Sequence, residues 1–319
     1  MATAPFLLAT PRALVTNGAS LPDPTMRLID ILTAIAVPMI WGFGFALAKD
    51  AFDQFPPIFL MCMRFGFAAL VLIWFVGRLR PGEAPRLALI AFVGGTLAYG
   101  MQFTGLEGLD ASTAALIVQL EVVFATIFAA VFLGDRIGWV RAGAMASAFI
   151  GIGLIAGEPS LHNSLFHLTL LIIGGIAWAG GQVLIKTLGD FGGLRLITYF
   201  AAFVAPQMLV VSLIVEDGQW QAVATASAMD WTKVIYLAFI MTAAGYALWY
   251  RLVGRYRLSQ VMPFILLVPV TSVAGGIVML GESLTFNIAL GGLIIMGAVA
   301  AIQLIPPPPE RRPTGEAAD

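Results

Sequence analysis

Two ionisable residues, Arg64 and Glu121, lie inside long apolar stretches of this 319-residue sequence. A guanidinium binds a carboxylate through a planar pair of donors, whereas a carboxylate takes an ammonium group or a proton. Either group costs a few kcal/mol or more at the centre of a bilayer if it faces lipid, so both should face a bundle interior, a partner or water. We expect either a binding site for a small molecule or proton, or a structural ion pair between the two that locks two helices.

Aromatic residues form the second candidate feature. Tyr99 and Phe103 are four residues apart and share one helical face, as do Tyr246 and Tyr250. Such rings stack on aromatic or apolar side chains, but they also anchor helices at membrane interfaces, an alternative that is strongest for Trp249 and Tyr250. Gln182 and Trp249 would add hydrogen-bonding edges. The candidate substrate-binding residues are Trp41, Arg64, Tyr99, Phe103, Glu121, Trp178, Gln182, Tyr246 and Trp249.

Other chemistries find little support in the sequence. The single cysteine, Cys62, excludes a disulfide framework, and two histidines, His162 and His167, stand five residues apart, off the spacing of a helical zinc clamp. We therefore expect no catalytic residues, no metal site, no cofactor and no enzyme activity. The formal net charge of -1 offers no basic excess for nucleic-acid binding.

The elements that must position these residues are membrane-spanning helices. The chain is 60% hydrophobic and only 11% charged, with a mean hydropathy of +0.93, which excludes a soluble globular protein. About 20 apolar residues in a helix cross the hydrocarbon core. Cutting the sequence at its charges, glycines and prolines predicts an all-α integral membrane protein with ten spans, at residues 28–48, 57–77, 87–106, 111–133, 139–156, 165–185, 194–215, 231–250, 259–280 and 284–305.

Loop charges predict the orientation. Fourteen of the 17 Lys and Arg residues fall on one side of this ten-span arrangement and only Lys49 and Lys233 on the other. Because basic loops are retained in the cytoplasm, both termini should be cytoplasmic, in a bacterial-type inner membrane. The N-terminal segment 1–27 reads as a cytoplasmic tail rather than a signal peptide, and 306–319, which opens with four prolines, as a disordered cytoplasmic tail.

An internal repeat divides the spans into two sets of five. The segment Leu133-Gly134-Asp135 is echoed 147 residues later by Leu280-Gly281-Glu282, and the same spacing pairs Tyr99 with Tyr246 and Ser112 with Ser259. Trp41-Gly42 is matched by Trp178-Ala179 at a spacing of 137. Five spans per repeat force the copies, 28–156 and 157–305, to cross the membrane in opposite senses, and such inverted repeats are typical of secondary transporters.

Two five-helix repeats, each opening with Trp-Gly/Ala-x-Gly and ending in a Leu-Gly-Asp/Glu turn, resemble the drug/metabolite transporter superfamily, in particular its EamA-type branch. The resemblance covers residues 28 to 305. It implies an outward carrier of amino acids and related metabolites without an ATPase domain, and the many aromatic residues are similar to those of aromatic amino-acid exporters. The sequence indeed lacks a phosphate-binding G-x-x-x-x-G-K-[ST] loop.

The sequence therefore predicts a secondary-active exporter of aromatic and neutral amino acids and related metabolites that works by alternating access. Its partners would be a small-molecule substrate and the lipid bilayer, and a monomer would suffice to form the pathway. The alternative is proton-coupled efflux of lipophilic cations or drugs, with Glu121 as the cation-binding and proton-binding carboxylate and the rings supplying cation–π faces.

Overall fold

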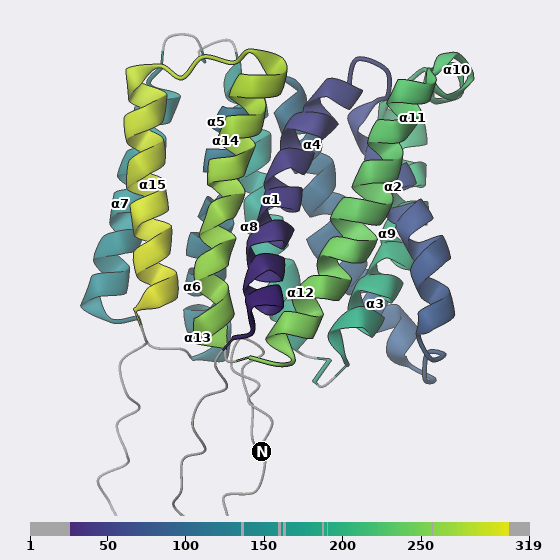
Figure 1. The fold of residues 1–319 in the computed structure, drawn as a ribbon, viewed down its shortest axis with the longest axis horizontal. Coiled ribbons are helices and arrows are strands. Elements are labelled where there is room, and N and C mark those ends of the chain that lie inside the picture. Colours follow the sequence, from purple (N-terminus) through teal and green to yellow (C-terminus); the bar gives the residue numbers. More distant parts are fainter. Residues whose placement is uncertain are drawn as a thin grey trace, which may run out of the picture.

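The computed structural model describes residues 26–134, 137–158, 161, 164–186, 188–189, 191–256 and 258–305. Over these residues the chain is helical and contains no strand, and ten helices are long and apolar enough to cross a membrane (Figure 1). The prediction of ten spans is confirmed, with ends that differ by up to four residues from the expected ones. The predicted tails lie outside the described residues, apart from Met26 and Arg27.

Several spans consist of more than one helical segment. The bounds are α1 Leu28–Ala51; α2 Pro57–Leu72 with η1 Ile73–Phe75; α3 Glu83–Ala91, η2 Phe92–Leu97 and α4 Ala98–Glu107; α5 Ala111–Val118 and α6 Leu120–Leu133; α7 Trp139–Ala156; α8 Leu165–Lys186; α9 Gly193–Val215; α10 Gln219–Thr225, which lies in a connection; α11 Ala228–Ile235, η4 Tyr236–Ala244 and α12 Gly245–Val253; α13 Leu258–Val261, η5 Met262–Leu266 and α14 Leu267–Leu280; and α15 Phe286–Leu304.

The bundle has two ends, which we name by the course of the chain. The described chain begins at Met26 and stops at Ile305 at the same end, the lower one in Figure 1. We call this the terminal end, and the opposite end, which carries α10 and the turn between α14 and α15, the distal end. An even number of spans brings both ends of the chain to one side, as the loop charges require.

Helix interruptions occur at matching positions in the two halves of the chain. The third and eighth spans each contain a π-helical segment, η2 and η4, whose last residues, Leu97 and Ala244, are 147 positions apart. α6 and α14 are related over their full length by the same offset. Each ends at a glycine in the left-handed region, Gly134 at φ 75° and Gly281 at φ 69°, which a residue with a Cβ adopts only at a cost. These matches are consistent with two inverted five-helix repeats.

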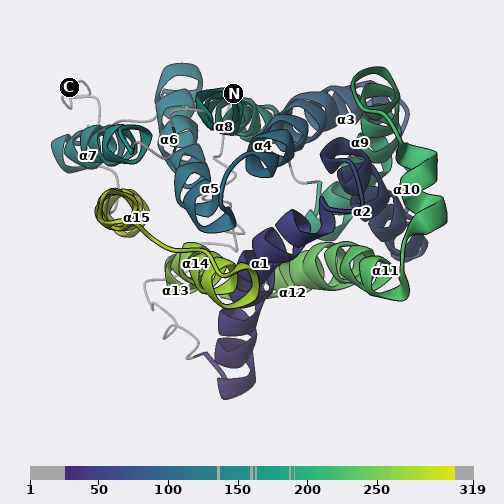
Figure 2. The same ribbon diagram turned by 90° about the horizontal axis from the view of Figure 1, so that it is seen from above.

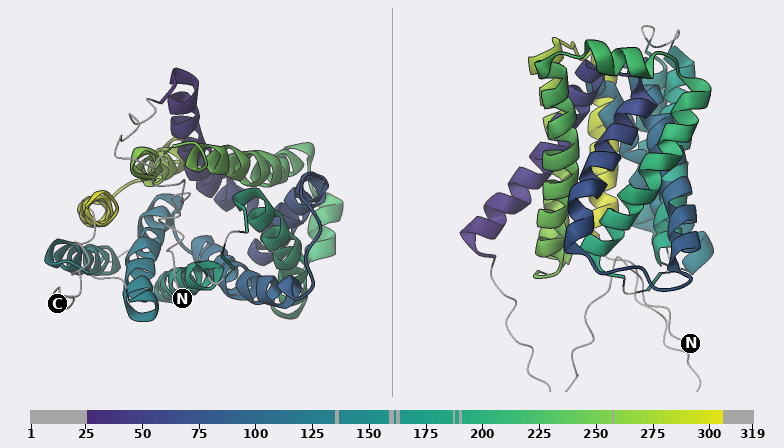
Figure 3. Two further views of the ribbon diagram at one scale, coloured as in Figure 1. Left: turned by 90° about the horizontal axis from the view of Figure 1, so that it is seen from below. Right: turned by 90° about the vertical axis from the view of Figure 1, so that its right-hand side faces the viewer.

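The helices pack in two groups that each mix the two halves of the sequence. In one group α1 packs against α14, α12 and η4, and in the other α8 packs against α4, η2 and α6. Two further pairs complete the bundle: α2 with α9, and α7 with α15, which stand side by side at one edge (Figures 1 and 2). Seen from below and from the side, α1 leans outward at its terminal end (Figure 3).

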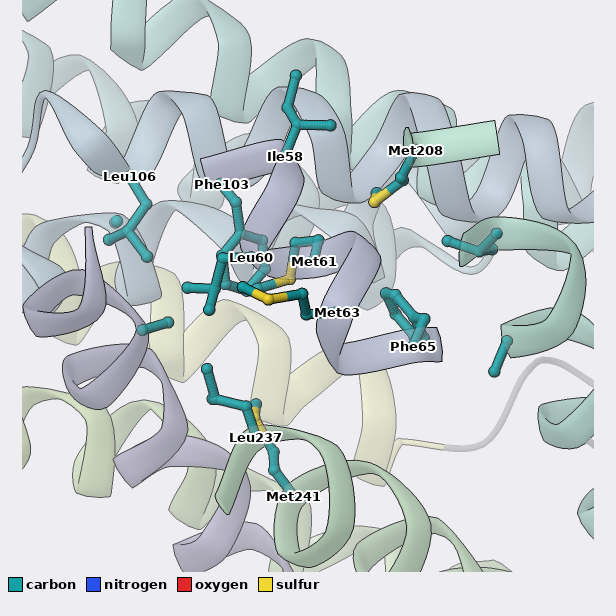
Figure 4. Packing of buried hydrophobic residues seen from close by; sticks show 14 of the residues in the cluster. Ile58, Leu60, Met61, Met63, Phe65, Phe103, Leu106, Met208, Leu237 and Met241 are labelled. Carbon is teal, nitrogen blue, oxygen red and sulfur yellow. The ribbon is translucent and has the colours of Figure 1, made fainter. Parts of the chain in front are cut away.

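Small residues permit the closest helix contacts. Gly94 of η2 and Gly181 of α8 meet backbone to backbone, and a Cβ on Gly181 would lie 2.3 Å from the Cα of Gly94. Close approach through glycine is a usual means of packing helices in membranes, where apolar burial offers little net driving force. Larger side chains fill the core around α2, where Met61, Phe65 and Phe103 lie together (Figure 4).

Candidate functional site

Arg64 lies on α2 and is only 2% exposed. Its Nε donates to Oγ1 of Thr242 at 2.8 Å, and Nη1 lies 3.7 Å from the sulfur of Met61. The guanidinium carbon stands over three rings at 5.1 to 5.9 Å from their centroids, those of Phe65, Tyr99 and Phe103. No carboxylate of the described residues forms an ion pair with this side chain, so neutral groups surround the positive charge.

Thr242, the partner of Arg64, belongs to the π segment η4. Its hydroxyl donates to the carbonyl of Leu237, five residues earlier, at 2.8 Å, and accepts from Arg64. π-helical turns inside α-helices widen the backbone and are frequent at functional sites. The equivalent segment η2 also binds a polar side chain, because Thr96 donates to Gln207 of α9 at 2.8 Å.

Glu121 stands in the first turn of α6, directly after the helix break at Gln119. Its carboxylate accepts a hydrogen bond from the side-chain amide of Gln102 on α4. No basic side chain of the described residues pairs with it. Gly175 of α8 faces it closely: a Cβ there would lie 3.5 Å from Cγ of Glu121. The predicted alternative of an Arg64–Glu121 ion pair is therefore not formed in this structure.

Tyr99 and Tyr246 meet at the centre of the molecule, with their hydroxyl oxygens 3.4 Å apart. These residues are 147 positions apart, the offset of the predicted repeat, so their contact is consistent with a pseudo-two-fold axis near this point. Phe103 packs against Tyr99 at a centroid distance of 6.1 Å and, like Arg64, is almost completely buried.

Trp41 and Trp249 extend this cluster on the side of α1 and α12. The Trp41 ring lies 5.1 Å from the Tyr246 ring and 5.6 Å from the Trp249 ring, and its Nε1 donates to the carbonyl of Met241 at 3.0 Å. The structure thus brings seven of the nine predicted residues into one cluster, in which Tyr246 links the tryptophans to Tyr99 and Gln102 links Glu121 to α4. They are Trp41, Arg64, Tyr99, Phe103, Glu121, Tyr246 and Trp249.

Trp178 and Gln182 are not joined to this group. Both lie on α8 and are half-buried, and neither forms a hydrogen bond or ring contact with the described residues. Gln102 and Thr242, in contrast, contact the two charged residues and were not among the predicted site residues. The signal for Gln102 was its place between Tyr99 and Phe103, as an amide deep inside a span.

The geometry leaves one cation and one carboxylate in a shared aromatic environment without neutralising each other. Tyr99, Gln102 and Phe103 of α4 connect them, because the two rings face Arg64 and the amide binds Glu121. Such a site can receive a carboxylate on the guanidinium and an ammonium group or proton on the carboxylate. Within the described residues, no cluster of three or more His, Cys, Asp or Glu could hold a metal ion.

Comparison with known families gives one match over most of the chain. The profile of the EamA-like transporter family matches residues 28–157 and 165–304. Each of these two matched segments contains five of the ten candidate spans. The family consists of transporters rather than enzymes.

Curated relatives and a solved structure extend this comparison. A protein of Salmonella typhimurium named "Probable amino-acid metabolite efflux pump" is 30% identical over 85% of this chain and 93% of its own. A protein of the same name from Escherichia coli is 29% identical over 84% and 92%. A "Probable terminal-alkyne amino-acid exporter" of Streptantibioticus cattleyicolor is 26% identical over 88% and 94%. One crystal structure, 17% identical, superposes with a TM-score of 0.62 over 88% of this chain and 98% of that one, and so shares the fold.

Proposed function

Since this chain belongs to the EamA-like transporter family, we propose that it is a secondary-active exporter of amino acids, aromatic and neutral ones in particular, and of related metabolites. The observation that carries the substrate class is the pair of unneutralised charges at the centre of the bundle. An amino acid brings one carboxylate and one ammonium group, and its zwitterion would match Arg64 and Glu121 without adding net charge to the membrane interior.

The surrounding residues support the preference for aromatic and neutral side chains. Tyr99, Phe103, Tyr246 and Trp41 provide ring faces near the two charges. Rings stack on aromatic substituents and also accommodate apolar ones, whereas a further charge on the substrate would have no partner there. The names of three relatives, which mention amino-acid metabolites and amino acids, support the same class.

The mechanism we propose is alternating access. The central site draws residues from both helix groups: Tyr99 and Glu121 come from the group of α8, and Trp41 and Tyr246 from the group of α1. Movement of one group against the other would expose the site to one end at a time. The basic loops predict that the protein lies in an inner membrane with its terminal end facing the cytoplasm. Export then runs from the terminal to the distal end.

Counterflow in proteoliposomes tests this function. Vesicles loaded with unlabelled threonine, methionine, phenylalanine or tryptophan should take up the same labelled amino acid saturably. Glu121→Gln should slow exchange by about tenfold or more, because the amide cannot bind a proton or pair with an ammonium group. Arg64→Gln should raise the half-saturating concentration, and Arg64→Lys, which keeps the charge but loses the planar fork, should lie between.

The control is Cys62→Ser, a half-buried position outside the central cluster, which should exchange like the wild type. No exchange of any of these amino acids by a monodisperse preparation would contradict the amino-acid proposal. Uptake of a lipophilic cation that survives Arg64→Gln but not Glu121→Gln would instead support the alternative, cation efflux, because a simple cation needs the carboxylate alone.

A further inference from the structure

A turn at the distal end directs Glu282 back towards the bundle. α14 ends at Leu280, and Gly281, at φ 69°, donates its backbone N–H to the carbonyls of Gly276 and Ile277. The N–H of Glu282 then bonds to Gly276 at 3.2 Å. The bond from Gly281 to Ile277 around a left-handed glycine is that of an αL C-cap, which reverses the chain at a helix C-terminus.

The Glu282 side chain caps α5, which forms one span with α6 of the other helix group. One carboxylate oxygen accepts the backbone N–H of Ala111 at 2.5 Å, and the other accepts the N–H of Ser112 at 2.9 Å and its hydroxyl. These two N–H groups belong to the first turn of α5, where backbone N–H groups have no acceptor within the helix. Asp110 precedes α5 and has a favourable residue type for a cap, yet its side chain forms no capping bond.

Gly276 leaves room for this contact. A Cβ on Gly276 would lie 2.1 Å from the carboxylate of Glu282 and 2.4 Å from the hydroxyl of Ser112. Any larger residue there would displace the carboxylate from α5. Lys49 adds a second tie between the groups, because its ammonium, at the end of α1, donates to the carbonyls of Leu106 and Glu107 at 3.1 and 2.5 Å.

Behind these contacts lies a buried threonine of α5. Thr113 of α5 is 0% exposed, and its hydroxyl has no hydrogen-bond partner. Thr113 and Ile117 share one face of α5, and Glu121 follows on the same span after the break at Gln119. α5 also packs against α14 and α15, whereas no comparable packing joins η5 to α6 at the terminal end of the described structure.

We propose that Glu282, bound to the N-terminus of α5, is the latch of the gate at the distal end. Breaking its three hydrogen bonds releases α14 from α5 and lets the distal end open. This inference rests on the proposed function, in which the distal end is the exit. Gly276 gives the Glu282 side chain room, and Gly281 turns the chain towards α5. The carboxylate itself makes the three hydrogen bonds, so its replacement should favour the open state.

A thiol reporter tests the latch without any substrate. In a Cys62→Ser background, Thr113→Cys provides a single buried cysteine, which reacts with a charged methanethiosulfonate reagent when the gate opens. In nanodiscs, where both faces are accessible, we expect Glu282→Gln and Gly276→Ala to raise the modification rate by about tenfold, since each weakens bonds that only the closed state makes.

Glu216→Gln is the matched control. Glu216 also caps a helix N-terminus at the distal end, because it accepts the backbone N–H groups of Ile58 and Phe59 at 2.7 and 3.0 Å, but it joins α9 to α2 instead. Its replacement should leave the reporter rate within about twofold of the wild-type rate. Equal rates in the Glu282, Gly276 and Glu216 variants, all monodisperse, would overturn the proposal.

A cross-link covers the case in which Glu282 variants do not fold. Ser112→Cys and Gly276→Cys, again without Cys62, place two thiols across the latch, and oxidation should stop amino-acid counterflow until the disulfide is reduced. Full exchange by the oxidised protein would overturn the latch. A reporter that responds as expected in a protein that exchanges none of the amino acids would contradict the proposed substrate alone.

Discussion

Trp41 and Trp178, which the predicted repeat matches with each other, have different surroundings. Trp41 donates to the carbonyl of Met241 and packs against Tyr246 and Trp249. Trp178 is half-buried and forms neither a hydrogen bond nor a ring contact with the described residues. The two helices that carry them, α1 and α8, therefore use the same residue in different ways within one structure.

The helix contacts around the two tryptophans differ in the same sense. α8 packs against η2 through backbone, with Gly181 on Gly94. α1 packs against η4 through side chains, with Trp41 on the carbonyl of Met241 and the Met241 side chain on Gly44. The two contacts lie at matching positions of the predicted repeat, and they differ because Met241 stands where the first half has Gly94.

Replacing Gly181 should have the largest effect on this comparison. In Gly181→Ala the new Cβ meets the Cα of Gly94 at 2.3 Å, a backbone contact that a side-chain rotation cannot relieve. We expect a loss of stability of about 2–3 kcal/mol and a clear fall in the thermal midpoint measured by size-exclusion chromatography after heating.

Gly297→Ala is the matched control, because the same change in α15 brings the Cβ within 4 Å of nothing. Both variants gain the same helix propensity, about 1 kcal/mol, so their difference reports the contact alone. Equal midpoints for the two variants would mean that α8 and η2 do not meet as described.

The two tryptophans themselves give an intermediate effect. Trp41→Phe keeps a ring beside Tyr246 but loses the bond to Met241, and we expect it to cost about 1 kcal/mol of stability. Trp178→Phe removes no hydrogen bond or ring contact with the described residues and should change stability by less than about 0.5 kcal/mol. The thermal midpoints of the two variants provide the measurement. A larger loss for Trp178→Phe than for Trp41→Phe would contradict the assigned asymmetry.

Much of the fold was readable from the sequence because a bilayer imposes a simple rule. Each apolar run must be helical and long enough to cross, so charges and prolines mark the ends of the spans. The two Leu-Gly-Asp/Glu turns also predicted where α6 and α14 end. The π segments η2 and η4 were not predicted, because their sequences are as apolar as the rest of their spans and only tertiary packing selects the wider turn.

The charged residues of the site were readable for the opposite reason. Arg64 and Glu121 are conspicuous where charge is costly, and the structure buries Arg64 and half-buries Glu121. Their partners, Thr242 and Gln102, were not predicted, because an amide or hydroxyl inside a span does not show which side chain it binds. Glu282 was recognised only as part of a repeated turn, and its contact with α5 joins residues 170 positions apart or more.

The smallest expected effect on stability comes from Asp110, which lies beside Glu282 at the distal end. Burial raises the pKa of this carboxyl above its ordinary value of 3.8, as does the nearby Glu282, while Lys49 opposes the shift. An acid whose pKa is raised in the folded protein binds more protons there than in the unfolded chain, so stability falls as the pH rises from 3.8 through the raised value. Asp110→Asn removes this dependence. We expect its thermal midpoint to equal that of the wild type near pH 4 and to exceed it by about 1–2 °C at pH 7.

In the reporter background, the same change should slow modification of Thr113→Cys, because Glu282 then keeps its place on α5 without a neighbouring like charge. A lower midpoint for Asp110→Asn at pH 7 would mean that the pairing of Asp110 with Lys49 outweighs its burial and its repulsion from Glu282.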